Sequence, residues 1–174
     1  MGRAFPLFCA GLAFVAVFAH LVINEKINFQ KLIKTTPKKL PDIQSRMGFV
    51  VVHLTPGIAW IVISMCFVAF KRLGSPAIDP LYGYEKVVQS AKNNLTNSVE
   101  QFLMLSVSQL ILAVHLSAKT LINVIPALNI CFIIGRITFW LGYPRYRSFG
   151  FVVTQTPIMA SILYNIYKYI KIFY

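Results

Sequence analysis

Five apolar runs, each close to the length of a membrane-spanning helix, constrain this sequence most. A helix needs about 20 mainly apolar residues to cross a hydrocarbon layer about 30 Å thick, because each residue adds about 1.5 Å. The first two runs contain no Asp, Glu, Lys or Arg, whereas the fourth contains Arg136. The predicted spans cover residues 5–23, 49–70, 84–116, 119–143 and 148–167. The sequence therefore predicts an all-α integral membrane protein.

The composition supports this prediction. Of the 174 residues, 57% are hydrophobic and 13% are charged, against roughly 45–50% and about 25% in soluble domains. This balance excludes a soluble enzyme, a disordered chain and a disulfide scaffold. The net charge is +12, but the basic residues lie between apolar runs and form no nucleic-acid-reading element. We expect them to meet the headgroups of membrane lipids.

The chain divides into three parts by composition. Residues 1–24 hold an N-terminal transmembrane helix, residues 25–48 form a basic loop, and residues 49–174 form a four-helix membrane domain. The loop is expected to be a solvated linker that contacts lipid headgroups. The turn residues Gly74 and Pro80 precede the third span, and the connections at 116–120 and 143–148 are short enough to require tight antiparallel hairpins.

The first run has a second interpretation, as a cleaved signal peptide. Arg3 precedes it, and Val17 and Ala19 supply small residues before a cleavage point. Its 19 apolar residues exceed the core of a signal peptide, which is typically about 7–15 residues long. A retained helix is therefore the favoured interpretation. The orientation stays open, because seven basic residues flank one side of the membrane and nine flank the other.

Polar residues at membrane depth mark the candidate site. A charge at the bilayer centre costs about 2.5–3.5 kcal/mol even on the lenient insertion scale, so such residues must face protein, water or ligand. Asn93, Asn97 and Glu100 recur at helical spacing on the third span and share one face. Arg136, Phe139 and Tyr143 do the same on the fourth span.

Two interpretations of these faces stay open from periodicity alone. In the first, Glu100 and Arg136 pair inside the bundle, with Asn97 as a helix-to-helix hydrogen bond worth about 0.6 kcal/mol. In the second, the faces form a polar pocket for a small zwitterionic or anionic ligand, with Arg145 and Arg147 at its mouth.

Two separate motifs resemble one known family. The first comprises Asp79-Pro80-Leu81 with Glu85, and then residues 97–102; the second comprises residues 135–143, followed by 147–151 and 154–157. In order and spacing they are similar to the second helix, and to the third helix with the start of the fourth, of the MAPEG superfamily, the membrane-associated proteins in eicosanoid and glutathione metabolism. The resemblance covers residues 49–172. The added helix at 5–23 is similar to the mattrin-like branch of transmembrane proteins.

The resemblance implies a homotrimer of four-helix subunits that binds glutathione between the second family helix of one subunit and the third of its neighbour. Asn97 and Glu100 would then hold the backbone groups and the amine of the peptide. Arg136 and Tyr143 would belong to the same pocket, and Arg147 would hold the thiol as a thiolate. The implied chemistry is that of a glutathione transferase or peroxidase. The implied location is the endomembrane system, in the endoplasmic reticulum or another membrane of the secretory pathway.

Two positions depart from the pattern of active relatives. Asn93 takes the place of an arginine that binds a ligand carboxylate, and Phe139 takes the place of a tyrosine. These departures predict binding without efficient catalysis. The rival interpretations are a noncatalytic membrane regulator or scaffold that reuses the fold, and a small transporter. No metal is expected, because His20, His53 and His115 lie on separate helices without ligand spacing.

Overall fold

The structure is a computed structural model that describes residues 4–73, 75–79, 81 and 83–173. Arg3, Gly74 and Pro80, on which some expectations rest, lie outside the described residues. The described helices are α1 (Ala4–Ile23), α2 (Phe29–Leu32), η1 (Pro37–Lys39), α3 (Ile43–His53), α4 (Thr55–Leu73), η2 (Pro76–Ile78), η4 (Glu85–Val87), α5 (Gln89–His115), α6 (Ala118–Gly142) and α7 (Ser148–Phe173).

The described residues contain five helical segments long and apolar enough to cross a membrane, which confirms the predicted spans. Four of them are α1, α5, α6 and α7, and the fifth joins α3 and α4 into one segment over Ile43–Leu73. That segment has 31 residues, more than the roughly 20 that a span needs. It therefore extends beyond the hydrocarbon layer or tilts within it.

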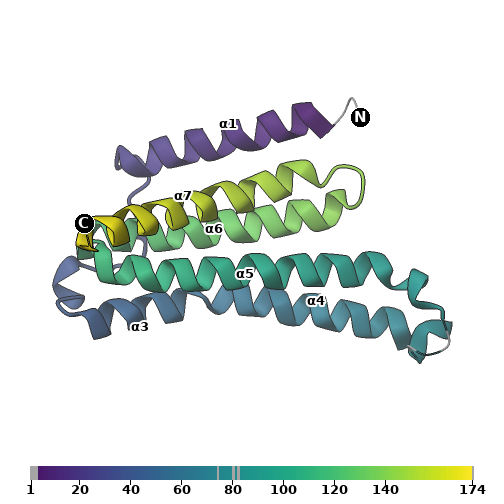
Figure 1. Ribbon diagram of the computed structural model, residues 1–174. Coiled ribbons are helices and arrows are strands. Elements are labelled where there is room, and N and C mark those ends of the chain that lie inside the picture. Colours follow the sequence, from purple (N-terminus) through teal and green to yellow (C-terminus); the bar gives the residue numbers. More distant parts are fainter. Residues whose placement is uncertain (1–3, 74, 80, 82, 174) are drawn as a thin grey trace.

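The five spans lie side by side, with α5, α6 and α7 in the middle (Figure 1). The joined α3 and α4 run along α5, whereas α1 packs on α7 at the opposite side (Figure 1). The chain's amino end, the α4–α5 connection and the α6–α7 turn lie at one end of the bundle. This end is called the α4–α5 end below. The α5–α6 turn and the carboxyl end lie at the other end.

The second span begins earlier than the sequence predicted, at Ile43 instead of Phe49. Asp42 caps the helix by accepting a hydrogen bond from the Ser45 backbone N–H at 3.2 Å, which is how an aspartate starts a helix. A break at Leu54 separates α3 from α4 just before Pro56, which has no backbone N–H to continue the hydrogen-bond ladder.

The basic loop is more than a solvated linker. Phe29 and Leu40 are buried against the bundle, with 3% and 5% of their surfaces exposed. The Phe29 backbone N–H donates to Asn123 Oδ1 at 3.1 Å. Arg46 donates to the carbonyl oxygens of Leu40 and Leu116, at 3.3 and 3.2 Å. Apolar side chains between the lysines thus attach part of this segment to α6, which the lysine spacing alone did not reveal.

The third span begins at Gln89, later than the predicted Tyr84, because Glu85 sits in a short 3₁₀ turn ahead of it. The Glu85 carboxylate pairs with Arg72 at 2.8 Å and with Lys92 at 2.6 Å. These hydrogen-bonded cations hold the pKa of Glu85 below its usual value. The ion pairs tie the end of α4 to the start of α5 and fix the α4–α5 end.

Candidate functional site

The polar face of α5 starts at the α4–α5 end and meets the last turn of α6. Asn93 is exposed and donates from Nδ2 to the Tyr143 hydroxyl oxygen at 3.0 Å. Its Oδ1 accepts a hydrogen bond from Gln89 Nε2 at 2.8 Å. Two residues that the sequence assigned to one pocket, 50 positions apart, are therefore in direct contact.

Arg136 joins the two motifs inside the bundle. Its side chain is buried, with 1% of the residue exposed. Nη1 donates to Asn97 Oδ1 at 2.6 Å, whereas Nε and Nη2 donate to Thr154 Oγ1 at 3.2 and 3.0 Å. The guanidinium carbon lies 4.8 Å from the centre of the Phe139 ring. A buried cation is tolerated only where such partners replace water, and α5, α6 and α7 each supply one.

Two glycines allow this arrangement by bringing α6 and α7 into backbone contact. A Cβ added at Gly135 would overlap Thr154 Oγ1, and one added at Gly150 would overlap the Phe139 backbone N. Small residues let membrane helices approach closely enough for their backbones to touch. Thr154 can therefore reach the guanidinium of Arg136 while donating its own hydrogen to the Gly150 carbonyl at 3.0 Å.

A row of rings leads from the buried arginine to the α4–α5 end. The centres of the Phe139 and Tyr143 rings lie 5.8 Å apart. The guanidinium carbon of Arg147 lies 5.6 Å from the centre of the Tyr143 ring, and Arg147 is exposed. Phe139 is buried, with 4% exposed, so this position of the motif offers packing and no hydroxyl group.

Glu100 does not pair with Arg136, so that part of the first interpretation is wrong, whereas Asn97 does form a helix-to-helix hydrogen bond, with Arg136. Glu100 is exposed on α5, and no hydrogen bond or ion pair from another described residue reaches its carboxylate. It lies about 16 Å along α5 from Gln89, at about 1.5 Å per residue. An ionised carboxylate inside the hydrocarbon layer would have to face water, protein or a ligand.

Arg145 is the remaining residue that the sequence assigned to the pocket. Arg145 is exposed in the turn between α6 and α7, near the α4–α5 end.

The sequence interpretation missed Thr154, although this residue stands in one of the recognised motifs. It was not singled out because a threonine in an apolar run gives no signal of its own until a buried cation faces it.

The face that these residues form offers both hydrogen-bond donors and hydrogen-bond acceptors. Asn97 accepts from Arg136 through Oδ1, which leaves its Nδ2 group to donate to a ligand. Glu100 supplies an acceptor, whereas Tyr143 and Arg147 supply a hydroxyl group and a cation. Three of the five N–H donors of Arg136 are used within the chain, and one of them positions Asn97.

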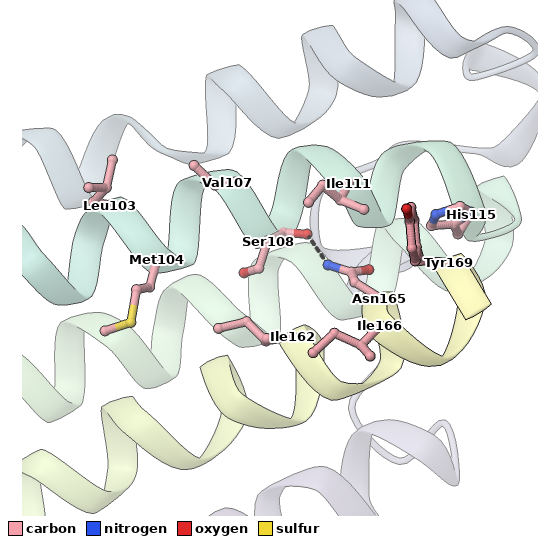
Figure 2. A pocket seen from close by; sticks show the side chains of 10 residues that line it. All are labelled: Leu103, Met104, Val107, Ser108, Ile111, His115, Ile162, Asn165, Ile166 and Tyr169. Carbon is pink, nitrogen blue, oxygen red and sulfur yellow. Dashed lines mark hydrogen bonds between the residues drawn. The ribbon is translucent and has the colours of Figure 1, made fainter. Parts of the chain in front are cut away.

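An apolar groove continues this face toward the other end of the bundle. It lies between α5 and α7 and has a volume of about 510 Å³ (Figure 2). Leu103 and Val107 of α5 form one wall, on the same side of the helix as Glu100. Asn165 of α7 closes the groove by donating to the Ser108 carbonyl at 3.0 Å (Figure 2). The exposed face of α5 is thus a polar segment followed by an apolar groove.

Comparison with known proteins gives one kind of relative. Two proteins named Transmembrane protein 79, from Mus musculus and from Bos taurus, are each 26% identical to this chain over 106 residues. The aligned segment is 59% of this chain and 25% of each relative, so the chain spans about a quarter of the length of these relatives. No family model and no solved structure matches the sequence. This similarity, together with the five apolar helices, identifies a multi-pass integral membrane protein.

Proposed function

We propose that this protein is a MAPEG-like membrane protein, of the mattrin-like branch, that binds glutathione in a pocket between subunits of a homotrimer. The observation that carries the proposal is the contact between Arg136 and Asn97 beside an exposed Glu100. The two motifs that resemble the family are far apart in the sequence. Their contact within one chain supports a shared pocket, whereas its position between subunits comes from the resemblance.

The exposed carboxylate supports the position of this pocket between subunits. Glu100 has apolar neighbours on its face of α5, among them Leu103 and Val107, with 63% and 50% exposed. In the trimer that the resemblance implies, α6 of a neighbouring subunit would cover these side chains. Glu100 would then face a closed space between chains, where the ammonium group of glutathione would neutralise it.

The catalytic part of the proposal depends on Arg147 and Tyr143. A cation beside a thiol lowers its pKa and raises the thiolate fraction, which is the nucleophilic form. Arg147 is held over the Tyr143 ring at the α4–α5 end, where glutathione would place its sulfur. Glutathione transferase or peroxidase chemistry would follow if that sulfur lies within reach of Arg147.

A second candidate function is that of a noncatalytic regulator or scaffold with the same fold. The observation that favours it is the state of Asn93, whose side chain is already engaged by Tyr143 and Gln89. An amide held in this way cannot replace the forked arginine that grips a carboxylate. The buried Phe139, which has no hydroxyl group, also favours this second candidate. In either case we place the protein in an endomembrane such as the endoplasmic reticulum.

Calorimetric titration of reduced glutathione into the purified protein in lipid nanodiscs tests the proposal. We expect saturable binding at one site per chain. N-acetylated glutathione, which lacks the ammonium group, should bind more weakly, because Glu100 loses its partner. Absence of heat with both ligands would reject the glutathione pocket and leave the scaffold as the better account.

A further inference from the structure

A second polar cleft lies inside a single chain, at the α4–α5 end. It has a volume of about 270 Å³ and is formed by α4, α5 and α6. The lining residues are Phe67, Lys71, Ser90, Ala91, Asn94, Trp140, Leu141 and Tyr143. Lys71, Ser90 and Leu141 each lie within three residues of a helix end at this side of the bundle. The cleft therefore opens where headgroups meet the hydrocarbon layer.

Asn94 gives the cleft an unused acceptor. The residue is buried, with 7% of its surface exposed, and its Oδ1 has no hydrogen-bond partner among the described residues. A buried acceptor without a partner costs about 1–3 kcal/mol, so a ligand that supplies an N–H donor would be stabilised there. Asn94 is buried on the side of α5 next to the face that carries the exposed Asn93 and Glu100.

The walls of the cleft suit a cation next to that acceptor. Phe67 and Trp140 pack edge to face, with ring centres 5.1 Å apart. Aromatic rings attract an ammonium group placed over their faces. An ammonium group at Asn94 would therefore find an oxygen acceptor and the Trp140 ring within one cleft, whereas the Phe67 ring already has Lys71 over it.

The rim of the cleft suits an anion. Lys71 is exposed, and its Nζ lies 5.1 Å from the centre of the Phe67 ring. The Tyr143 hydroxyl oxygen accepts from Asn93, so its own hydrogen can be donated toward the cleft. Ser90 adds a second hydroxyl group at the same level. Together these groups present one cation and two O–H donors to a phosphate.

We propose that this cleft binds a phosphoethanolamine group, as found in the headgroup of phosphatidylethanolamine. The ammonium group would donate to Asn94 Oδ1 beside the Trp140 ring, and the phosphate would meet Lys71 and the Tyr143 hydroxyl group. The cleft has room for about nine waters at ~30 Å³ each, which matches a group of this size. Leu141, 72% exposed, lies where the acyl chains would continue into the bilayer. The site needs no second subunit, but it shares Tyr143 with the proposed glutathione pocket.

Native mass spectrometry of the delipidated full-length protein, titrated with lipids of identical acyl chains, tests the proposal. Phosphatidylethanolamine donates N–H groups, whereas the trimethylated ammonium of phosphatidylcholine donates none. We expect phosphatidylethanolamine to bind about tenfold more tightly, the factor that one charge-assisted hydrogen bond supplies. Asn94→Leu should abolish this preference. If free phosphoethanolamine displaces phosphatidylethanolamine equally well, the cleft binds the headgroup chemistry and the natural ligand can be soluble. If it does not displace the lipid, the natural ligand is the lipid itself.

A matched pair of lysines controls for general attraction to phosphate. Lys168 lies over the Tyr164 ring at 5.5 Å, at the opposite end of the bundle, in the same arrangement that Lys71 has over Phe67. Lys71→Met should weaken both lipids severalfold, whereas Lys168→Met should leave both affinities unchanged. Equal binding of the two lipids by the unmodified protein would overturn the proposal, even if Asn94→Leu fails to fold. A preference that survives Asn94→Leu would overturn it as well.

Discussion

Arg136 donates from Nη1 to Oδ1 of Asn97 at 2.6 Å, across the boundary between α6 and α5. This bond joins the two motifs by which the chain resembles a glutathione-binding family. Arg136 and Glu100 do not pair. The guanidinium donates its hydrogen bonds inside the bundle, while the carboxylate lies on the surface of α5. The predictions below follow from this division between a buried cation and an exposed anion.

The first prediction concerns the number of subunits. Native mass spectrometry from lipid nanodiscs should give a trimer, because a neighbouring chain would cover the exposed Glu100 carboxylate, which lipid cannot solvate. Glu100→Leu should weaken the trimer, since lipid covers a leucine as well as a neighbouring chain does. A monomer in both nanodiscs and mild detergent would rule out a pocket between subunits.

The second prediction concerns the glycine contact between α6 and α7. Gly150→Ala should lower the free energy of unfolding by about 1–3 kcal/mol, because its methyl group overlaps the backbone of Phe139. Gly48→Ala is the matched control. It lies within α3 with no atom within 4 Å of an added Cβ, so it should raise stability by about 0.5–1 kcal/mol. Equilibrium unfolding in detergent measures both, and equal effects would show that the close approach does not stabilise the bundle.

The third prediction concerns membrane orientation. The family resemblance places the glutathione entrance on the cytosolic side, so Ser75, near the α4–α5 end, should be cytosolic. In a variant without native cysteines, Ser75→Cys should react with an impermeant maleimide added from the cytosolic side. Ser117→Cys, in the exposed turn at the opposite end, should react only from the lumen. Reversed labelling would invert the topology.

The fourth prediction concerns catalysis, which we expect to be slow or absent in the unmodified protein. Asn93→Arg should tighten glutathione binding by restoring a two-pronged contact with a carboxylate. Lys92→Arg is the control, since its side chain is paired with Glu85 and adds a guanidinium away from the site. Rapid conjugation by the unmodified protein would show that neither Asn93 nor Phe139 limits the chemistry.

Arg147→Ala separates binding from thiol activation. Removing a cation beside the sulfur disfavours the thiolate, so the pKa of bound glutathione should rise toward the ordinary thiol value of about 8.5. The ultraviolet absorbance of the thiolate, titrated with pH, should then show its midpoint at higher pH than in the unmodified protein. An unchanged midpoint would remove Arg147 from the thiol site.

The sequence predicts the spans well because hydrocarbon thickness sets their length, but it locates their ends less well. The start of α3 depends on the cap at Asp42, and the burial of Phe29 and Leu40 depends on a surface that exists only after α6 has packed. Neither is visible as an apolar run.

The sequence likewise predicts only part of the candidate site. Helical periodicity correctly places Asn93, Asn97 and Glu100 along one side of α5. It does not tell which neighbour that side meets, and the direction of Arg136 depends on how closely α6 and α7 approach at Gly135 and Gly150. The Arg136 contact with Thr154 is a consequence of that approach, so periodicity within one helix could not reveal it.

The most direct measurement is the calorimetric affinity of glutathione for the unmodified protein, for Glu100→Gln and for Arg145→Ala. Glu100 is a carboxylate at membrane depth on the motif face, and losing its charge-assisted hydrogen bond should cost about 1.5–3 kcal/mol, or roughly ten- to a hundredfold in affinity. Arg145 is exposed in the turn and should matter less. The proposed pocket predicts strong weakening by Glu100→Gln and little by Arg145→Ala. Unmeasurable binding by the unmodified protein, or equal affinities in all three, would contradict it.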